Sequence, residues 1–247
     1  MKTIACYNIK GGVGKTATAI NLSYLSALEG HSTLVWDLDP QGAASFYFRI
    51  KAKIKGGTTE LFKRRSRLQR AIKATDYEGL DLIPADFSYR NLDLLLEQKK
   101  HSGQQLGKLL KPIHSEYDYL FLDCPPSISL VSENVFEMAD LILVPTIPST
   151  LSLRTLSQLQ KFCSNNGYNK GKIVPFFSMA DLRKTLHRTI LEHPPKRGEP
   201  MLNRHIPYAS EIEQMGVKRA AVETYAHSSK AAAAYRALWS ELKQRYL

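Results

Sequence analysis

The stretch Lys10-Gly11-Gly12-Val13-Gly14-Lys15-Thr16 decides how this chain folds. It stands between an apolar, β-branched run at residues 3–7 and a segment at residues 16–29 whose apolar side chains recur at helical spacing. Glycines let the backbone turn tightly with its amide groups facing inward, and the following helix presents its positive N-terminal end. This order predicts a loop built to hold a polyphosphate. Lys15 would reach the terminal phosphates, and the Thr16 hydroxyl would ligate Mg²⁺.

Short apolar runs alternate with helical patterns along the rest of the chain. They lie at residues 3–7, 33–36, 80–83, 119–122, 141–144 and 173–177. Several are nearly continuous in apolar residues, as expected for strands that are covered on both faces. The repeated order of strand, helix and strand predicts an α/β fold: a doubly wound, mostly parallel sheet flanked by helices, as in P-loop NTPases.

Length and composition favour one cytoplasmic domain spanning residues 1–247. At 27.9 kDa, with 43% hydrophobic and 23% charged residues, the chain suits a single large core and excludes a disordered or collagen-like protein. No apolar run approaches the roughly 18 residues of a membrane span, and the first ten residues lack a signal-peptide pattern. The three cysteines are odd in number and widely spaced, which fits neither a disulfide framework nor a zinc site, so we expect buried thiols.

Acidic residues follow two of the expected strands. Asp37 and Asp39 come after residues 33–36, and Asp123 ends the run at residues 119–122. Parallel strands bring such ends to the sheet edge that carries the phosphate loop. We therefore expect Asp37 and Asp123 to hold Mg²⁺ together with Thr16, and one of the aspartates to orient an attacking water.

The net charge of +11 is concentrated in two blocks. Residues 49–73 contain ten basic residues and one acid, and residues 183–247 contain twelve basic residues and six acids. A basic run is often only a solvated helix face. Two blocks in one domain favour a shared cationic surface that neutralises phosphates of duplex DNA without reading its sequence.

The spaced motifs resemble those of ParA/MinD-type ATPases, in the ParA partition branch. Residues 10–16 are similar to the family's deviant phosphate loop, in which an extra lysine, here Lys10, stands at the entrance. The resemblance extends over most of the chain, through these segments: Asp37-Leu38-Asp39-Pro40-Gln41-Gly42, Asp123-Cys124-Pro125-Pro126-Ser127, Pro145 to Pro148 with Ser152-Leu153, and Met179-Ala180-Asp181 with Ile206-Pro207.

The resemblance implies a homodimer that sandwiches two ATP molecules. Lys10 would stabilise charge on the partner's phosphates, Lys15 would act within its own site, and Asp39 would position the hydrolytic water. The nucleotide would contact residues of the loop and of the segments that close on the adenine: Lys10, Gly11, Gly12, Val13, Gly14, Lys15, Thr16, Ala17, Met179, Asp181 and Pro207. A lysine supplied in trans would tie phosphate chemistry to dimerisation, much as an arginine finger does.

The same resemblance implies a positioning function on the nucleoid. The ATP-bound dimer would hold nonspecific double-stranded DNA, and a ParB-like or analogous adaptor on a cargo would stimulate hydrolysis. The candidate DNA contacts are Lys196, Arg197, Arg204, Lys218 and Arg219, with the 49–73 block as a second source. The cargo would be a plasmid, a chromosome region or a protein assembly such as a carboxysome or chemoreceptor cluster.

Two positions depart from the family pattern. Family members commonly carry a second threonine after Thr16, whereas this chain has Ala17, whose amide can face a phosphate but which offers no hydroxyl. Ala43 stands where an asparagine is frequent, and the sequence gives this change no interpretation.

Three alternatives use the same fold. A MinD-like membrane switch would use a C-terminal apolar stripe as its membrane anchor, although such a stripe more commonly docks on a sheet. The stripe consists of Tyr235, Leu238, Trp239, Leu242 and Tyr246. An ATP-dependent synthetase would need a second substrate motif, and none is evident. An iron–sulfur reductase would need bridging cysteines, and Cys124 lies inside the magnesium motif. We expect no membrane partner.

Overall fold

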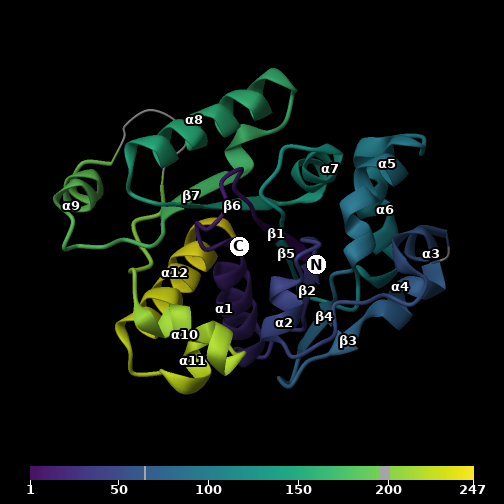
Figure 1. Cartoon of the computed structure of the whole chain (residues 1–247), viewed down its shortest axis with the longest axis horizontal. Helices are drawn as coiled ribbons and strands as arrows, with labels where there is room; N and C mark the ends of the chain where they lie inside the picture. Colours follow the sequence, from purple (N-terminus) through teal and green to yellow (C-terminus); the bar gives the residue numbers. More distant parts are fainter. Residues whose placement is uncertain (64, 195–200) are drawn as a thin grey trace.

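One sheet carries the fold, with its strands in the order β3-β4-β2-β5-β1-β6-β7 (Figure 1). The computed structural model describes residues 1–63, 65–194 and 201–247. Neighbouring strands run parallel except at β3, which pairs antiparallel with β4. The strands are β1 Lys2–Cys6, β2 Thr33–Asp37, β3 Lys73–Ala74, β4 Leu80–Ile83, β5 Tyr119–Asp123, β6 Leu141–Thr146 and β7 Ile173–Phe177. The predicted mostly parallel, doubly wound sheet is confirmed.

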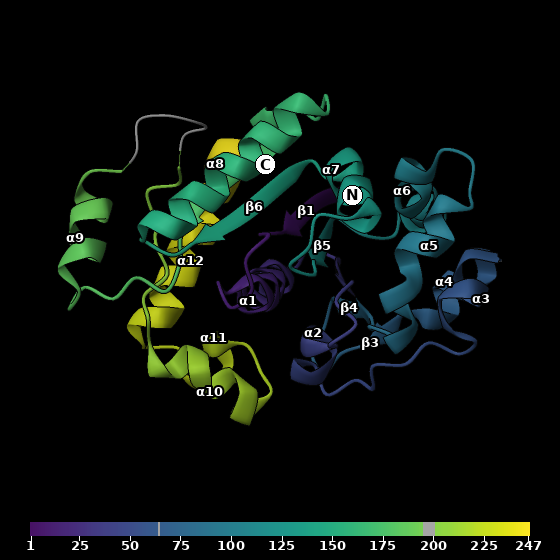
Figure 2. The same cartoon turned by 45° about the horizontal axis from the view of Figure 1, so that its top comes forward.

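Helices cover both faces of this sheet (Figures 1 and 2). Because successive side chains of a strand point to opposite faces, Ala5 packs into one core and its neighbours Ile4 and Cys6 pack into the other. The first core is completed by α3 Gly57–Lys63, α4 Arg65–Ala71, α5 Leu92–Glu97, α6 Gln105–Leu110, α7 Leu130–Met138 and α8 Thr150–Asn165. The second is completed by α1 Lys15–Leu28, α2 Ala43–Tyr47, α10 Ser210–Lys218, α11 Val222–Tyr225 and α12 Lys230–Tyr246. Helix α9, Thr185–Glu192, lies at the β7 end of the molecule.

The C-terminal helix α12 docks on the sheet. Tyr235, Leu238, Trp239 and Leu242 are buried in the second core, so most of the apolar stripe is already covered by protein. This is the docked arrangement that the sequence favoured over a membrane anchor. Within the described ranges, no helix combines the length and apolar character needed to cross a bilayer.

Two further sequence expectations can be compared with the fold. Cys6, Cys124 and Cys163 are free and buried, as predicted. Strand β3 was not expected, because its two residues, Lys73 and Ala74, are exposed and lie at the end of the basic block, which has no strand-like alternation of apolar side chains.

Candidate functional site

The glycine-rich loop joins β1 to α1 at the carboxyl edge of the sheet. Gly12 and Gly14 have φ values of 70° and 95°, in the left-handed region that favours glycine. A Cβ atom added at Gly14 would lie 2.9 Å from the Ser178 hydroxyl oxygen, so a side chain there would also collide with the residue that follows β7. Helix α1 begins at Lys15, and its first amides are thus directed into the loop.

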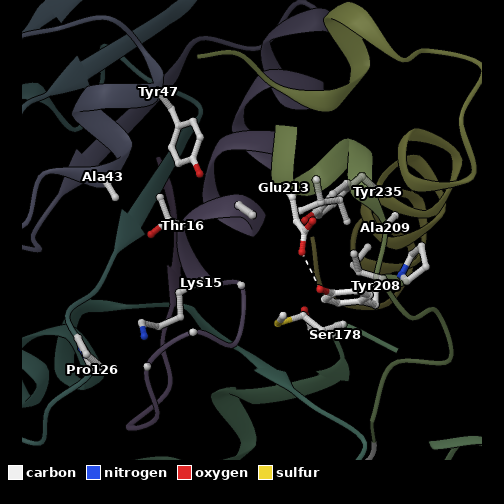
Figure 3. A pocket seen from close by; sticks show the side chains of 18 of the residues that line it. Lys15, Thr16, Ala43, Tyr47, Pro126, Ser178, Tyr208, Ala209, Glu213 and Tyr235 are labelled. Carbon is white, nitrogen blue, oxygen red and sulfur yellow. Dashed lines mark hydrogen bonds between the residues drawn. The ribbon is translucent and has the colours of Figure 1, made fainter. Parts of the chain in front are cut away.

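A cavity of about 360 Å³ opens beside this loop (Figure 3). Its walls come from the loop and α1, from α2, from the end of β7, and from residues 206–213. Of the residues predicted to bind nucleotide, these line it: Gly11, Gly12, Gly14, Lys15, Thr16, Ala17, Met179 and Pro207. Asp39 lines it as well, and its Oδ1 accepts a hydrogen bond from the Gln41 amide at 2.9 Å. Residues far apart in sequence therefore enclose one site.

Two buried carboxylates lie at neighbouring strand ends beneath the loop. Asp37 ends β2 and Asp123 ends β5, and the two residues are paired in register. Both are 0% exposed. Within the described part of the chain, Asp37 Oδ1 and both carboxylate oxygens of Asp123 have no hydrogen-bond partner. Burying unpaired anionic oxygens is costly, so this arrangement calls for a cation.

The pKa values of the two carboxyls reflect their burial. Desolvation raises the pKa of Asp37 to about 6, against the lowering effect of its hydrogen bonds from Ser45. Desolvation and the adjacent Asp37 charge raise the pKa of Asp123 well above its usual range, while the Thr16 hydroxyl and Lys15 act in the opposite direction. A bound cation would favour the charged forms of both groups.

Lys15 is the lysine of the loop that lines the cavity. Its side chain is buried, and its ammonium donates a hydrogen bond to the Lys10 carbonyl oxygen at 3.2 Å. Desolvation lowers the pKa of Lys15, and the negative charges of Asp123 and Asp39 oppose this effect. The positive charge of Lys15 thus interacts with these carboxylates, and Lys15 also lines the cavity.

The oxygen donors fit a magnesium ion that keeps water and phosphate ligands. Mg²⁺ prefers hard oxygen ligands and is usually held by one or two carboxylates with substrate phosphates, without an all-protein cage. Asp37, Asp123 and the Thr16 hydroxyl supply such a set. In keeping with this, the described residues contain no cluster of three or more His, Cys, Asp or Glu side chains placed to enclose a metal.

The far end of the cavity is shaped by residues 178–180 and 206–213. Met179 has a φ of 54°, an uncommon left-handed conformation for a residue with a side chain. Next to it, the backbone of residues 180 and 207 forms an isolated parallel bridge. The Tyr208 hydroxyl donates a 2.7 Å hydrogen bond to Glu213 Oε1, drawn in Figure 3.

Three of the predicted nucleotide-binding residues do not line the cavity. Val13 is fully buried in the protein interior. Lys10 is half-buried, and its amide donates to Asn8 Oδ1 at 2.9 Å. The carboxylate of Asp181 accepts two hydrogen bonds from the Arg183 guanidinium, at 2.8 and 3.0 Å, which hold the Asp181 pKa at about 2. A role for Asp181 in binding nucleotide stays a prediction.

The two basic blocks meet where α2 and α10 contact each other. Arg219 Nε donates to the Phe46 carbonyl oxygen at 2.9 Å, and its guanidinium lies 4.5 Å from the centre of the exposed Phe46 ring. Arg49 donates to the Lys218 carbonyl oxygen at 3.1 Å and also pairs with Asp76 at 2.7 Å. Arg49 of the first block and Lys218 and Arg219 of the second block therefore lie together here. A shared cationic surface that binds DNA stays a prediction.

Other predicted DNA contacts lie elsewhere. Arg204 is exposed, and its amide donates to Glu241 Oε2 at 2.9 Å. Lys196 and Arg197 lie outside the described residues. Most of the 49–73 block forms α3 and α4, which lie with α5 and α6 at the β3–β4 edge of the molecule (Figure 1).

Several site residues escaped the sequence reasoning. Tyr47, Ser178, Tyr208 and Glu213 line the cavity, and Ser45 holds Asp37. Ser178 could have been found, because it directly follows a parallel strand at the edge where ligands bind. The other four have no local signal that marks them.

Comparison with known proteins places the chain in a family. A family model described as AAA domain matches residues 1–170, and the chain belongs to that family of P-loop ATPases. The virulence plasmid ParA family protein pGP5-D of Chlamydia psittaci is 30% identical over 193 residues, which are 78% of this chain and 74% of that protein. The sporulation initiation inhibitor protein Soj of Bacillus subtilis is 35% identical over 159 residues, covering 64% of this chain and 63% of that protein. With these relatives, the chain is a ParA/MinD-type ATPase of the partition branch.

Solved structures share its fold. Cobyrinic acid a,c-diamide synthase from Mycobacterium smegmatis, with bound ATP analog and magnesium, has a TM-score of 0.83 at 24% identity, covering 100% of this chain and 96% of that one. McdA from Cyanothece, in its apo form, has a TM-score of 0.81 at 22% identity, covering 98% and 99%. At these identities the likeness concerns the fold alone.

Proposed function

We propose that this chain is an ATP-driven positioning switch that binds magnesium and ATP, dimerises, holds nonspecific DNA, and releases it on hydrolysis. The observation that carries the proposal concerns three buried oxygens on Asp37 and Asp123, beside the phosphate loop, that have no hydrogen-bond partner among the described residues. Such oxygens require a cation, and the adjoining cavity offers the loop amides and Lys15 to a polyphosphate. Magnesium ATP meets both requirements.

Each group of residues in the site would have a separate role in binding or hydrolysing ATP. The loop amides and Lys15 would bind the phosphates, and the cavity wall at Met179 and Pro207 would receive the base. Thr16, Asp37 and Asp123 would hold magnesium, which when bound neutralises developing charge on the phosphates. Asp39, at the cavity wall, would accept the proton of a water that attacks the γ-phosphorus as ADP leaves.

Lys10 would act on the partner's nucleotide in the dimer. It stands at the entrance of the loop and is absent from the wall of its own cavity, which agrees with a role across an interface. Charge supplied in trans stabilises a phosphoryl-transfer transition state only when two chains meet. A lone chain should therefore hydrolyse ATP slowly.

The cationic junction of α2 and α10 supports the DNA-binding half of the proposal. Arg219 and Lys218 would contact phosphates, and a dimer would double the number of such contacts. A cargo-bound adaptor, on a plasmid, a chromosome region or a protein assembly, would accelerate hydrolysis and so end DNA binding locally. The expected location is the nucleoid.

The test combines nucleotide state with DNA binding. Fluorescence anisotropy of a labelled duplex of arbitrary sequence should show binding with ATP and Mg²⁺, little binding with ADP, and a steep loss of affinity as salt rises. Asp39→Ala should remain dimeric and DNA-bound with ATP while turnover stops. DNA binding that ignores the nucleotide, or that responds weakly to salt, would contradict the proposal.

A further inference from the structure

Ser45, on helix α2, makes the direct hydrogen bonds to Asp37. The Ser45 amide and the Ser45 hydroxyl both bond Asp37 Oδ2, each at 2.7 Å. The other carboxylate oxygen, Oδ1, has no partner among the described residues. One oxygen of Asp37 is thus held by protein, and the other is left free.

A third bond fixes the direction of the Ser45 hydroxyl proton. The amide of Ala85, in the loop after β4, donates to Ser45 Oγ at 2.9 Å. An amide N–H can only donate, so the hydroxyl accepts from Ala85 and sends its single proton to Asp37. Ser45 is 0% exposed, so bulk water does not compete for these bonds.

This arrangement sets which way the Asp37 carboxylate faces. Two donors on Oδ2 hold the group against rotation, and both favour its charged form. The remaining oxygen, Oδ1, and both carboxylate oxygens of Asp123, on the paired strand end, are left without a partner among the described residues. Side chains that orient metal ligands in this way influence metal affinity without touching the metal.

We propose that Ser45 is a positioning residue for the divalent cation of the nucleotide site, holding Asp37 by Oδ2 so that Oδ1 remains available to that cation. This inference rests on the proposed magnesium–ATP site. It assigns to Ser45 an effect on metal affinity, which is separate from binding of the nucleotide itself. A purely structural role for Ser45, anchoring α2 and thereby Tyr47 in the cavity wall, would instead alter nucleotide binding with or without metal.

The experiment measures metal affinity and nucleotide affinity separately. Fluorescence of a methylanthraniloyl derivative of non-hydrolysable ATP reports binding to the full chain, first in EDTA and then during titration with Mg²⁺. Electron paramagnetic resonance of Mn²⁺ gives the metal affinity without any turnover. Ser45→Ala removes the hydroxyl, and Ser45→Thr keeps it. The matched control is Ser23→Ala, which removes a buried hydroxyl that bonds the Ile20 carbonyl oxygen on α1.

We expect Ser45→Ala to raise the metal midpoint about tenfold while leaving the nucleotide affinity in EDTA unchanged. Ser45→Thr and Ser23→Ala should behave like the natural chain. If Ser45→Ala fails to fold, Ser45→Cys, a weaker donor of similar size, should raise the midpoint by a smaller factor.

Two results would overturn the inference. One is an unchanged metal midpoint in Ser45→Ala and Ser45→Cys. The other is a loss of nucleotide affinity in EDTA equal to the loss with metal, which would assign Ser45 to the cavity wall. Failure of the proposed function would appear differently: the natural chain itself would bind the nucleotide equally with and without Mg²⁺, and the inference would fall with it.

Discussion

Replacing Asp37 by asparagine should make the metal-free protein less sensitive to pH. Asp37 is fully buried, and its pKa is raised from its ordinary 3.8 to about 6. Asp37→Asn keeps an oxygen that can accept the two Ser45 hydrogen bonds and removes the ionisation. The variant therefore isolates the cost of charging one carboxyl in the absence of magnesium.

The magnitude follows from linkage between proton binding and folding. Because the pKa of the folded state lies above that of the unfolded chain, the stabilising contribution is fully present below about pH 3.8. It is lost as the pH rises through about 6. The full shift corresponds to about 3 kcal/mol, of which about 1 kcal/mol falls between pH 5 and pH 7.5. Release of Asp123 from repulsion by Asp37 acts in the same direction.

Other titrating groups cancel in the comparison. Desolvation lowers the pKa values of His187 and His205, whose contributions to stability are present above pH 6.5 and weaken on acidification. Both histidines are common to the natural chain and the variant. The constant cost of burying an amide N–H in the variant also drops out when the same pair is compared at two pH values.

The assay is urea unfolding in EDTA, followed by fluorescence of the two buried tryptophans, Trp36 and Trp239. The free energy of unfolding of Asp37→Asn minus that of the natural chain should be about 1 kcal/mol larger at pH 7.5 than at pH 5, so that the variant gains relative stability as the pH rises. With Mg²⁺ and a non-hydrolysable ATP analogue, the natural chain should gain stability and the variant should gain much less. A difference that is the same at both pH values would refute the reasoning.

Two further predictions concern the phosphate loop and the cationic junction. Lys15→Ala should abolish nucleotide binding measured by calorimetry, because it removes the buried ammonium of the loop; normal ATP affinity would remove Lys15 from the site. Arg219→Gln should weaken binding of the ATP-bound protein to all duplexes alike and reduce the slope of log affinity against log salt by about 1 for each copy of the arginine in contact. Arg90→Gln is the matched control, since Arg90 lies over the exposed Phe87 ring at 4.2 Å, much as Arg219 lies over Phe46; an equal effect of both changes would count against a specific DNA role for Arg219.

The sequence predicted those parts of the molecule whose signals are local. Nearly continuous apolar runs predicted the parallel strands, because strands covered on both faces need apolar side chains on both. The loop and the aspartates at strand ends were correctly expected to meet at one edge of the sheet, because parallel strands align their carboxyl ends. Strand β2 in fact includes Asp37, and β5 includes Asp123, so each carboxylate is held by the sheet itself.

The remaining parts depend on contacts between distant residues. Tyr208 and Glu213 reach the cavity only through packing of the chain that follows β7, and Tyr47 reaches it through a five-residue helix. The pairing of Arg183 with Asp181 is different, because it joins residues only two positions apart and depends on the backbone geometry of a loop, which spacing in the sequence does not reveal. These features require the folded chain.

The central claim is that each chain supplies Lys10 to the nucleotide held by its partner. The most direct measurement mixes two inactive variants, Lys10→Ala and Asp39→Ala, and follows phosphate release. Each should be nearly inactive alone. In a mixed dimer, the Lys10→Ala chain keeps its own Asp39 and receives Lys10 from its partner, so one of the two sites is complete. Because random pairing makes about half of the dimers mixed, an equimolar mixture should recover about one quarter of natural turnover. No recovery, or full turnover by Lys10→Ala alone, would contradict the account.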